Sequence, residues 1–418
     1  MRCKLLLVAV AVLVGLPPDG KGQGTSGPDS VEALLRKEMD KRKIPGLQFA
    51  VVHHGKIVKL GAVGLANVQD SIPVTSQTLF TINSATKSFT GVAIMQLVEE
   101  GKLDLTAPVA RYLDGLPEAW RAVTVKQLLT HTSGLPGIMD SWGKLVIEGD
   151  AEASRAKVRT LPLEFKPGER FSYNQTNYLL LGEIIDRLSG QPFAQFIADR
   201  QLKVADMPRT AECGFGDSYD VVPRCARSYT FFRTAGGKHV RGNKLRNTFE
   251  EFPPFLRTAA GMSSTAEELA RWIIALEGGR LLKDKRSLDT LWTTGTLNNG
   301  SPAGFGGLLN GYALGWPAAL RSKHRAVGGV GGGRSAFFVY PDDDLAIVIL
   351  TNLQGAEPQA FIDKVAGYYI PDMSAAAGKW MRRERVLRRS SVYSPAAAGV
   401  WRADSAALNT GDRLWTGK

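Results

Sequence analysis

The chain has 418 residues, of which 44% are apolar and 22% charged; this composition is typical of a globular protein and excludes a fibrous or disordered one. The net charge of +12 would suit a nucleic-acid partner, but basic and acidic residues are interleaved along the sequence, so we expect none. Contact with an acidic cell wall is compatible with this charge.

The first residues have the pattern of a secretory signal peptide. Arg2 and Lys4 precede an apolar run, residues 5–16, which is too short to cross about 30 Å of hydrocarbon as a helix. We place the end of this signal peptide at residue 24 and expect a periplasmic or secreted protein. In such an oxidising compartment Cys213 and Cys225 either form a disulfide or remain separate thiols, and the sequence leaves both open.

A helix is predicted over residues 30–43, where apolar side chains recur at helical spacing until Pro45 and Gly46. Two β-rich runs follow, residues 47–52 and 56–63, separated by a His53-His54-Gly55 turn. Neighbouring strand residues point to opposite faces, and no third ligand is near the two histidines, so we expect no metal there.

A second apolar helix is predicted over residues 89–98, and the following segment, about 106–254, has the pattern of helices joined by Pro and Gly turns. Strands return at residues 337–339 and 345–351. We therefore expect one domain over residues 25–370, with an α/β part (about 25–105 and 255–370) and an inserted helical part (about 106–254). Residues 371–418, rich in Ala, Arg and Ser, form a docked extension or a disordered tail of unknown role.

Ser-x-x-Lys occurs three times, at Ser84/Lys87, Ser141/Lys144 and Ser154/Lys157. Only Ser84 follows a short apolar run and opens a buried-looking helix, which places its lysine one turn further on the same face. The other two pairs lie in polar surroundings and are expected on the surface. The context therefore selects Ser84 as a candidate nucleophile.

A serine hydroxyl needs a neighbouring base to act as a nucleophile. Lys87 supplies one if it is desolvated, because burial favours the neutral amine. Tyr173 is the best candidate for a second proton-transfer group, although a tyrosine is more often a packed core residue. The Ser84 amide, at the start of a helix, would be free to stabilise an oxyanion.

Several motifs then occur in one order. They are Phe-Thr-Ile-Asn-Ser-Ala-Thr-Lys at residues 80–87, Leu-Leu-Thr-His-Thr-Ser-Gly-Leu at 128–135, the block that begins Tyr-Asn-Gln at 173–182, the segment 258–264 and the strand region 328–352. Together they resemble the serine β-lactamase-like family, which includes class C β-lactamases, penicillin-binding peptidases and family VIII esterases. The resemblance spans about residues 30–368. It implies an α+β fold with an antiparallel sheet flanked by helices and an inserted helical subdomain.

The same resemblance assigns roles to particular positions. Ser84 is expected to be the nucleophile, Lys87 and Tyr173 the proton-transfer pair, and the amides of Ser84 and Gly332 the oxyanion hole. Gln175, Gly331 and Gly332 are expected to bind the substrate, and His131 to be structural. No metal or cofactor is implied, and the sequence does not reveal an oligomeric state.

Two positions depart from the family pattern. Gln175 replaces an asparagine and is one methylene longer, but its amide can still reach Lys87 and a substrate carbonyl. Gly329 occupies the place of the usual Lys or His in the final active-site strand. Losing one electrostatic group of this kind typically lowers the rate about 10²- to 10³-fold. A whole enzyme accelerates its reaction by roughly 10⁶-fold or more.

The substitution by Gly329 therefore predicts redirected rather than abolished catalysis. Lys323, His324 and Arg334 are close in sequence, but we expect them to face solvent at strand ends. The favoured substrate is a carboxylester or small amide. A weak β-lactamase or D-Ala peptidase is the alternative, and a non-catalytic cell-wall-binding homologue is a second. The sequence has no Gly-x-Ser-x-Gly elbow and no His-Glu-x-x-His, which argues against an α/β-hydrolase and a zinc hydrolase.

Overall fold

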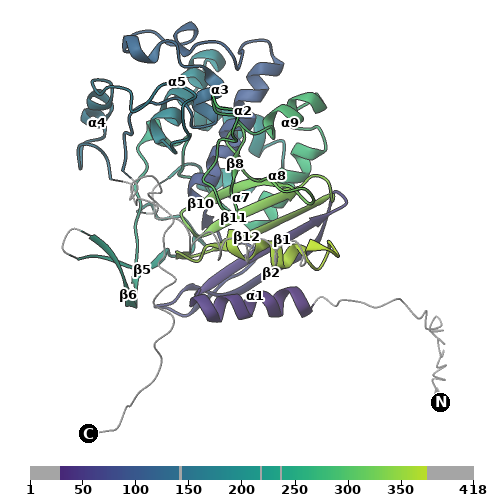
Figure 1. Ribbon diagram of the computed structural model, residues 1–418. Helices are drawn as coiled ribbons and strands as arrows, with labels where there is room; N and C mark the ends of the chain where they lie inside the picture. Colours follow the sequence, from purple (N-terminus) through teal and green to yellow (C-terminus); the bar gives the residue numbers. More distant parts are fainter. Residues whose placement is uncertain (1–28, 141–143, 217–218, 236–237, 374–418) are drawn as a thin grey trace, which may run out of the picture.

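A computed structural model describes residues 29–140, 144–216, 219–235 and 238–373. The predicted signal peptide and nearly all of the C-terminal tail lie outside these ranges. The centre of the molecule is an eight-stranded sheet with the order β3-β2-β1-β12-β11-β10-β9-β8, covered by helices (Figure 1). Its strands are β1 (Gly46–His53), β2 (Lys56–Asn67), β3 (Ile72–Pro73), β8 (Gly311–Tyr312), β9 (Pro317–Ala319), β10 (Ala326–Gly331), β11 (Ser335–Tyr340) and β12 (Leu345–Thr351).

The two ends of the described chain meet in the middle of this sheet. β1 pairs antiparallel with β2, and also with β12, where Leu47 lies opposite Thr351. The turn between β1 and β2 places His54 and Gly55 at φ values of 52° and 67°, which a glycine adopts without strain. The predicted first hairpin and the antiparallel sheet built from both ends of the chain are therefore confirmed.

Strict alternation along the central strands divides the hydrophobic core into two. In β12, Ile347 and Ile349 belong to one cluster of buried residues, whereas Val348 and Leu350 belong to the other. The first cluster is covered by α1 (Asp29–Arg42) and α10 (Ile362–Ala366), the second by α2 (Thr86–Glu99) and α8 (Ala266–Glu277). This two-sided burial explains the continuous apolar sequence of β12.

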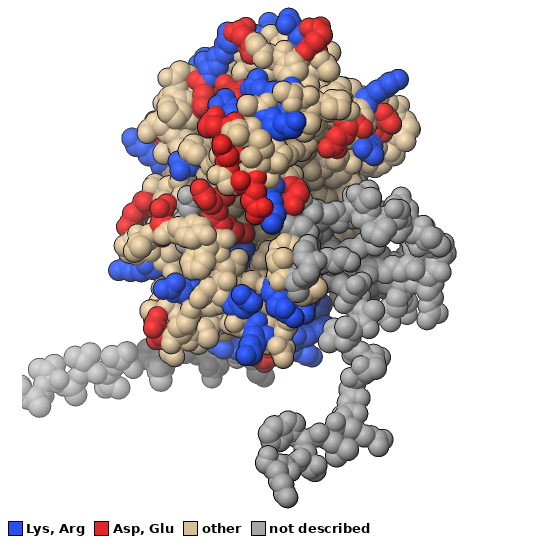
Figure 2. Space-filling view, turned by 90° about the vertical axis from the view of Figure 1, so that its left-hand side faces the viewer, with Lys and Arg blue, Asp and Glu red and all other residues tan. Residues whose placement is uncertain are grey.

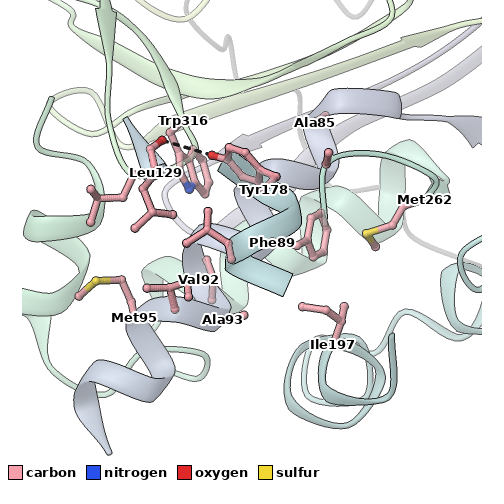
Figure 3. Packing of buried hydrophobic residues seen from close by; sticks show 14 of the residues in the cluster. Ala85, Phe89, Val92, Ala93, Met95, Leu129, Tyr178, Ile197, Met262 and Trp316 are labelled. Carbon is pink, nitrogen blue, oxygen red and sulfur yellow. Dashed lines mark hydrogen bonds between the residues drawn. The ribbon is translucent and has the colours of Figure 1, made fainter. Parts of the chain in front are cut away.

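Helix α2 passes through the second cluster and is buried on all sides over most of its length (Figure 3). Its Phe89 stacks on Trp272 of α8 with 4.0 Å between ring centroids. A Cβ at Gly91 would collide with the Leu314 carbonyl oxygen, so the chain needs glycine there. Such close packing holds the N-terminal turn of α2 in a fixed position.

The helical part contains α3 (Val125–Leu129), α4 (Ala151–Val158), α5 (Gln175–Ser189), α6 (Phe193–Ile197) and α7 (Pro208–Cys213); α9 (Lys285–Leu291) follows α8. Helix α5 packs against α2 and α3, and its Tyr178 hydroxyl donates to the Leu129 carbonyl at 3.3 Å (Figure 3). Short strands β4 (Phe80–Thr81), β7 (Ser263–Ser264) and β13 (Leu353–Gln354) lie outside the main sheet.

Part of the segment expected to be helical is a β-hairpin instead. β5 (Tyr229–Ala235) and β6 (Lys238–Asn247) form a long antiparallel pair that projects from the body (Figure 1). The sequence signal was present, since a Thr- and Phe-rich run precedes Gly236-Gly237. The prediction of a helical part over about residues 106–254 overlooked this short run, so it is wrong for β5 and β6.

The hairpin also concentrates positive charge. Arg233, Arg241, Lys244 and Arg246 are all exposed, and the hairpin belongs to the side of the molecule that faces the viewer in Figure 2. On that face, Lys and Arg gather below a region rich in Asp and Glu (Figure 2). Charges of both signs are thus present, but they are locally separated.

The structure also shows the state of the two cysteines that the sequence left open. Cys213 and Cys225 are free thiols, both partly buried, and burial raises the pKa of the Cys225 thiol to about 12. No disulfide joins them in this structure.

In the described ranges, no helix combines the length and apolarity needed to cross a bilayer.

Candidate active site

The segment that carries Ser84 is held against residues 262–264. β4 pairs with β7, and the Ile82 amide donates to the Met262 carbonyl at 2.9 Å. A single 3₁₀ turn, Asn83–Ala85, then leads into α2. Asn83 is buried and has a φ of 47°, a left-handed conformation that asparagine tolerates better than most residues. Ser84 therefore lies at the start of the central buried helix, as the sequence predicts.

Lys87 lies one helical turn after Ser84 and is only 1% exposed. Its Nζ donates to Gln175 Oε1 at 2.8 Å and to the Ala259 carbonyl at 3.0 Å. The same atom lies 4.7 Å and 4.9 Å from the ring centroids of Tyr173 and Tyr178. Because both acceptors are neutral, burial dominates and holds the pKa of Lys87 well below its usual value. The amine is thus suited to accept a proton.

Tyr173 lies between the serine and this lysine. Burial raises the pKa of its hydroxyl, and interactions with the neighbouring Ser84 and Gln175 side chains lower it by a smaller amount. The phenol therefore stays protonated at neutral pH. Ser84, Tyr173, Gln175 and Lys87 thus form one polar cluster, in which the predicted contact between Gln175 and Lys87 is present.

The N-terminus of α5 holds Tyr173 and Gln175 in place. Asn174 is the N-cap residue: its Oδ1 accepts from the Thr176 amide at 2.7 Å, and its Nδ2 donates to the Leu135 carbonyl at 2.5 Å. An asparagine at this position satisfies a backbone donor that the helix leaves open. The proton-transfer residues therefore lie next to a capped, rigid helix end.

His131 supports the same helix end from behind. Its ring is fully buried, and Nδ1 accepts from the Asn174 amide and from Asn177 Nδ2, both at 3.1 Å. Burial, and then the nearby Lys87, lower its pKa well below the usual value. A neutral ring that accepts two hydrogen bonds and packs 4.4 Å from the Tyr173 centroid suits a structural role.

The end of β10 passes directly beside the nucleophile segment. A side chain at Gly331 would collide with the Ile82 carbonyl oxygen, and one at Gly332, which has a φ of 55°, would lie 2.8 Å from Asn83 Cγ. Within the described residues, the Gly332 amide makes no hydrogen bond to a backbone carbonyl. Two glycines thus let this amide approach Ser84, as an oxyanion hole requires.

Gly329 is the point at which the strand differs from the family pattern. A Cβ there would lie 2.6 Å from Cζ of Phe337 and 3.1 Å from the Ala85 Cβ. The Phe337 ring is held edge-on against Trp316, with 5.5 Å between centroids. The space that a side chain from residue 329 would take, next to the residue after Ser84, is therefore filled by an aromatic ring.

Lys323, His324 and Arg334, three basic residues near Gly329 in the sequence, do not take over the role of the missing Lys or His. Arg334 is fully buried, which corrects the prediction that it faces water, and it pairs with Glu250. Lys323 and His324 both contact Asp372. They precede β10, whereas Gly331 ends it, and six strand residues span roughly 20 Å. Neither reaches Ser84.

The alternative Ser-x-x-Lys pairs are not comparable sites. Ser141 lies outside the described residues. Ser154 was expected on the surface but is buried, and its hydroxyl is bonded to Ile147 at 2.9 Å. Lys157 of the same pair is exposed. The two side chains therefore lie in different environments and do not form a proton-transfer pair.

An aromatic wall beside Tyr173 was missed by the sequence reasoning. Phe305 lies 5.3 Å from the Tyr173 ring and 5.1 Å from the Phe171 ring, measured between centroids, and is 39% exposed. It comes from a Gly-rich loop with no periodic pattern, so no local signal marked it. The wall provides an apolar surface next to the candidate proton-transfer residue.

Comparison with known proteins agrees with this geometry. The family model described as Beta-lactamase matches residues 31–367. Protein flp of Staphylococcus aureus (strain MW2) is 28% identical over 251 residues, which cover 58% of this chain and 47% of that protein. Protein Rv1367c of Mycobacterium tuberculosis is 30% identical over 273 residues, 60% of this chain and 66% of that one. The chain thus matches about half of Protein flp.

Solved structures show the same fold. The octameric penicillin-binding protein homologue from Pyrococcus abyssi has a TM-score of 0.66 at 25% identity, covering 86% of this chain and 81% of that one. D-amino acid amidase from Ochrobactrum anthropi has a TM-score of 0.65 at 23% identity, covering 87% and 99%. Because the matched region extends over most of the described residues, this chain belongs to the Beta-lactamase family.

Proposed function

We propose that this chain is an exported hydrolase that cleaves carboxylesters or small neutral amides through an acyl-enzyme on Ser84. Ser84 Oγ attacks the carbonyl carbon while its proton passes to the neutral amine of Lys87. The Ser84 and Gly332 amides stabilise the oxyanion that forms. Tyr173 then gives its proton to the departing alcohol or amine and is reprotonated from Lys87, and water hydrolyses the acyl-enzyme.

The observation that carries this proposal is the buried Lys87, whose hydrogen bonds within the described residues go to two neutral acceptors and whose Nζ lies 4.7 Å from the Tyr173 ring centroid. Burial lowers the pKa of an amine in this environment and so favours its neutral, basic form, whereas an ion pair would favour the protonated form. The tyrosine keeps its proton and can therefore serve as the acid. Lys87 and Tyr173 have separate roles because burial lowers the pKa of the amine and raises the pKa of the phenol.

The substrate class follows from the two sides of the site. Phe337 fills the space beside Gly329, so no cation at that position can attract a substrate carboxylate. Phe305 and Phe171 offer an apolar wall near Tyr173. Both features favour a neutral substrate with an apolar group. The family relationship also supports acyl transfer, since one solved structure of similar fold is EstCE1, described as a hydrolase with promiscuous acyltransferase activity.

A fluorophosphonate probe tests the nucleophile. Intact-mass analysis should find a single adduct, which peptide mapping assigns to Ser84 and which is absent in Ser84→Ala. Ser154→Ala is the matched control, because it removes the serine of a second Ser-x-x-Lys sequence. If the folded protein forms no adduct, the non-catalytic cell-wall-binding alternative replaces the proposal.

Turnover then separates the substrate classes. We expect kcat/KM for a p-nitrophenyl butyrate ester to exceed that for a chromogenic cephalosporin or a peptide that ends in D-Ala-D-Ala. A much higher value for the cephalosporin would instead identify a β-lactamase, and a higher value for the peptide would identify a D-Ala peptidase. Export is tested separately, by fractionating cells that produce the full chain and sequencing the N-terminus of the mature protein.

A further inference from the structure

Arg334 is an unusual residue to find inside the fold, because it is 0% exposed and lies in the turn between β10 and β11. One guanidinium nitrogen donates to Ser228 Oγ at 2.9 Å and to Thr81 Oγ1 at 3.3 Å. The other donates to Glu250 Oε1 at 3.1 Å. A buried arginine is costly unless it is paired, and here the pairing joins three separate segments of the chain.

Glu250 extends this pairing to the nucleophile segment. Its Oε2 accepts from Asn83 Nδ2 at 2.9 Å and lies 3.1 Å from Arg334 Nη1. One carboxylate therefore holds a side chain from each flank of the candidate oxyanion hole. Asn83 directly precedes Ser84, and Arg334 follows Gly332 by two residues.

Both flanks have backbone conformations that need support. Asn83 has a φ of 47° and Gly332 a φ of 55°, so the Ser84 and Gly332 amides belong to two left-handed turns that face each other. Ser335 Oγ donates to the Ile82 carbonyl at 2.8 Å, and the Thr351 amide donates to the Arg334 carbonyl at 2.8 Å. These bonds fix the backbone of each turn, whereas Glu250 links the side chains across them.

We propose that Glu250 and Arg334 are positioning residues that set the distance between the Ser84 and Gly332 amides through Asn83. This inference rests on the proposed function, because it matters only if these amides bind an oxyanion. The oxyanion exists only in the transition state, so a misplaced amide should lower kcat and leave KM nearly unchanged. Lys87 and Tyr173 do not contact the pair in the described structure, so the pH profile should keep its midpoints.

Two variants test the link in different ways. Asn83→Gly removes the side chain that Glu250 holds, keeps the left-handed backbone accessible and leaves the ion pair intact. Glu250→Gln with Arg334→Met removes both charges together, so that neither remains buried without a partner. For both variants we expect kcat for an ester to fall about 10- to 100-fold, with KM within about twofold and unchanged pH midpoints.

The matched control is a second partly buried pair away from the site, Arg321 with Asp363, whose atoms are 2.9 Å apart. Arg321→Met with Asp363→Asn should keep kcat per active site, with sites counted by the endpoint of fluorophosphonate labelling. Arg334→Lys keeps the charge but not the two-pronged geometry, and should recover only part of the rate.

The outcomes separate the two levels of the proposal. Wild-type kcat per labelled site in Asn83→Gly, or in the double variant, would overturn the positioning role. If Ser84→Ala nevertheless loses both labelling and turnover, the proposed function remains intact and only the positioning role is refuted. Unchanged ester turnover in Ser84→Ala would instead refute the proposed function itself. If the double variant does not fold, Asn83→Gly decides the question, because its ion pair remains.

Discussion

The close approach of the Phe337 ring to Gly329 can be tested quantitatively, because the ring should exclude any side chain at residue 329. A Cβ at residue 329 would lie 2.6 Å from Cζ of Phe337, which is closer than packed carbon atoms approach, so the ring must move. Overpacking of this kind costs about 1–3 kcal/mol. Without the clash, Gly→Ala within a strand would gain roughly 0.5–1 kcal/mol.

A double-mutant cycle isolates this clash. Phe337→Ala alone should cost about 3–5 kcal/mol, because it empties a buried site next to Trp316. In the double variant the new methyl group at residue 329 points into the emptied space. Its penalty should therefore disappear, and we expect an interaction free energy of about 1–3 kcal/mol in favour of the double variant.

Urea denaturation of the two single variants, the double variant and the wild type measures each free energy of unfolding, provided that the m-values agree. Gly242→Ala in β6 is the matched control, because the nearest atom to its Cβ would be 3.4 Å away. Its combination with Phe337→Ala should be additive. Additivity within about 0.5 kcal/mol for Gly329→Ala as well would refute the argument that the ring occupies this space.

Further predictions concern the chemistry and the pH dependence. Because burial lowers the pKa of Lys87, stopped-flow acylation rates should fall as the pH drops through a midpoint well below 10.5, and Lys87→Met should abolish that limb. Buried His131 is neutral when folded, whereas its unfolded form gains a proton below about pH 6.5. The free energy of unfolding should therefore decrease by about 1.4 kcal/mol per pH unit below that pH, measured against His131→Asn, which should lack this component. Phe305→Ala should raise KM for long-chain esters relative to acetate esters without lowering Tm, because its ring is partly exposed. Gly329→Lys with Phe337→Ala should raise cephalosporin turnover relative to ester turnover, and unchanged relative rates would contradict the substrate argument.

Much of the fold could be predicted because its patterns are local. The helical spacing of Val31 and Met39 marked α1, the β-rich runs around His54 marked β1 and β2, and the apolar run after Ser84 marked α2. Each depends on residues a few positions apart. The position of the nucleophile followed from the same local context together with the order of motifs along the chain.

The features that were missed depend on distant contacts. Arg334 is expected in water by residue type, and its burial depends on partners far away in the sequence, such as Glu250, which is 84 residues away. Phe305 reaches Tyr173 from a loop whose path no periodicity describes. In each case the environment is created by tertiary packing and leaves no trace in the neighbouring sequence.

The pairing of β1 with β12 has a consequence for synthesis. Leu47 and Thr351 are separated by roughly 300 residues, and such long-range pairing delays the formation of a fold. A growing chain that has reached α5 already contains Ser84, Lys87 and Tyr173, but not the Gly332 amide or strands β8 to β12 of the sheet. The candidate active site can therefore assemble only after the last strands of the sheet have been made, and it is incomplete in a nascent chain until then.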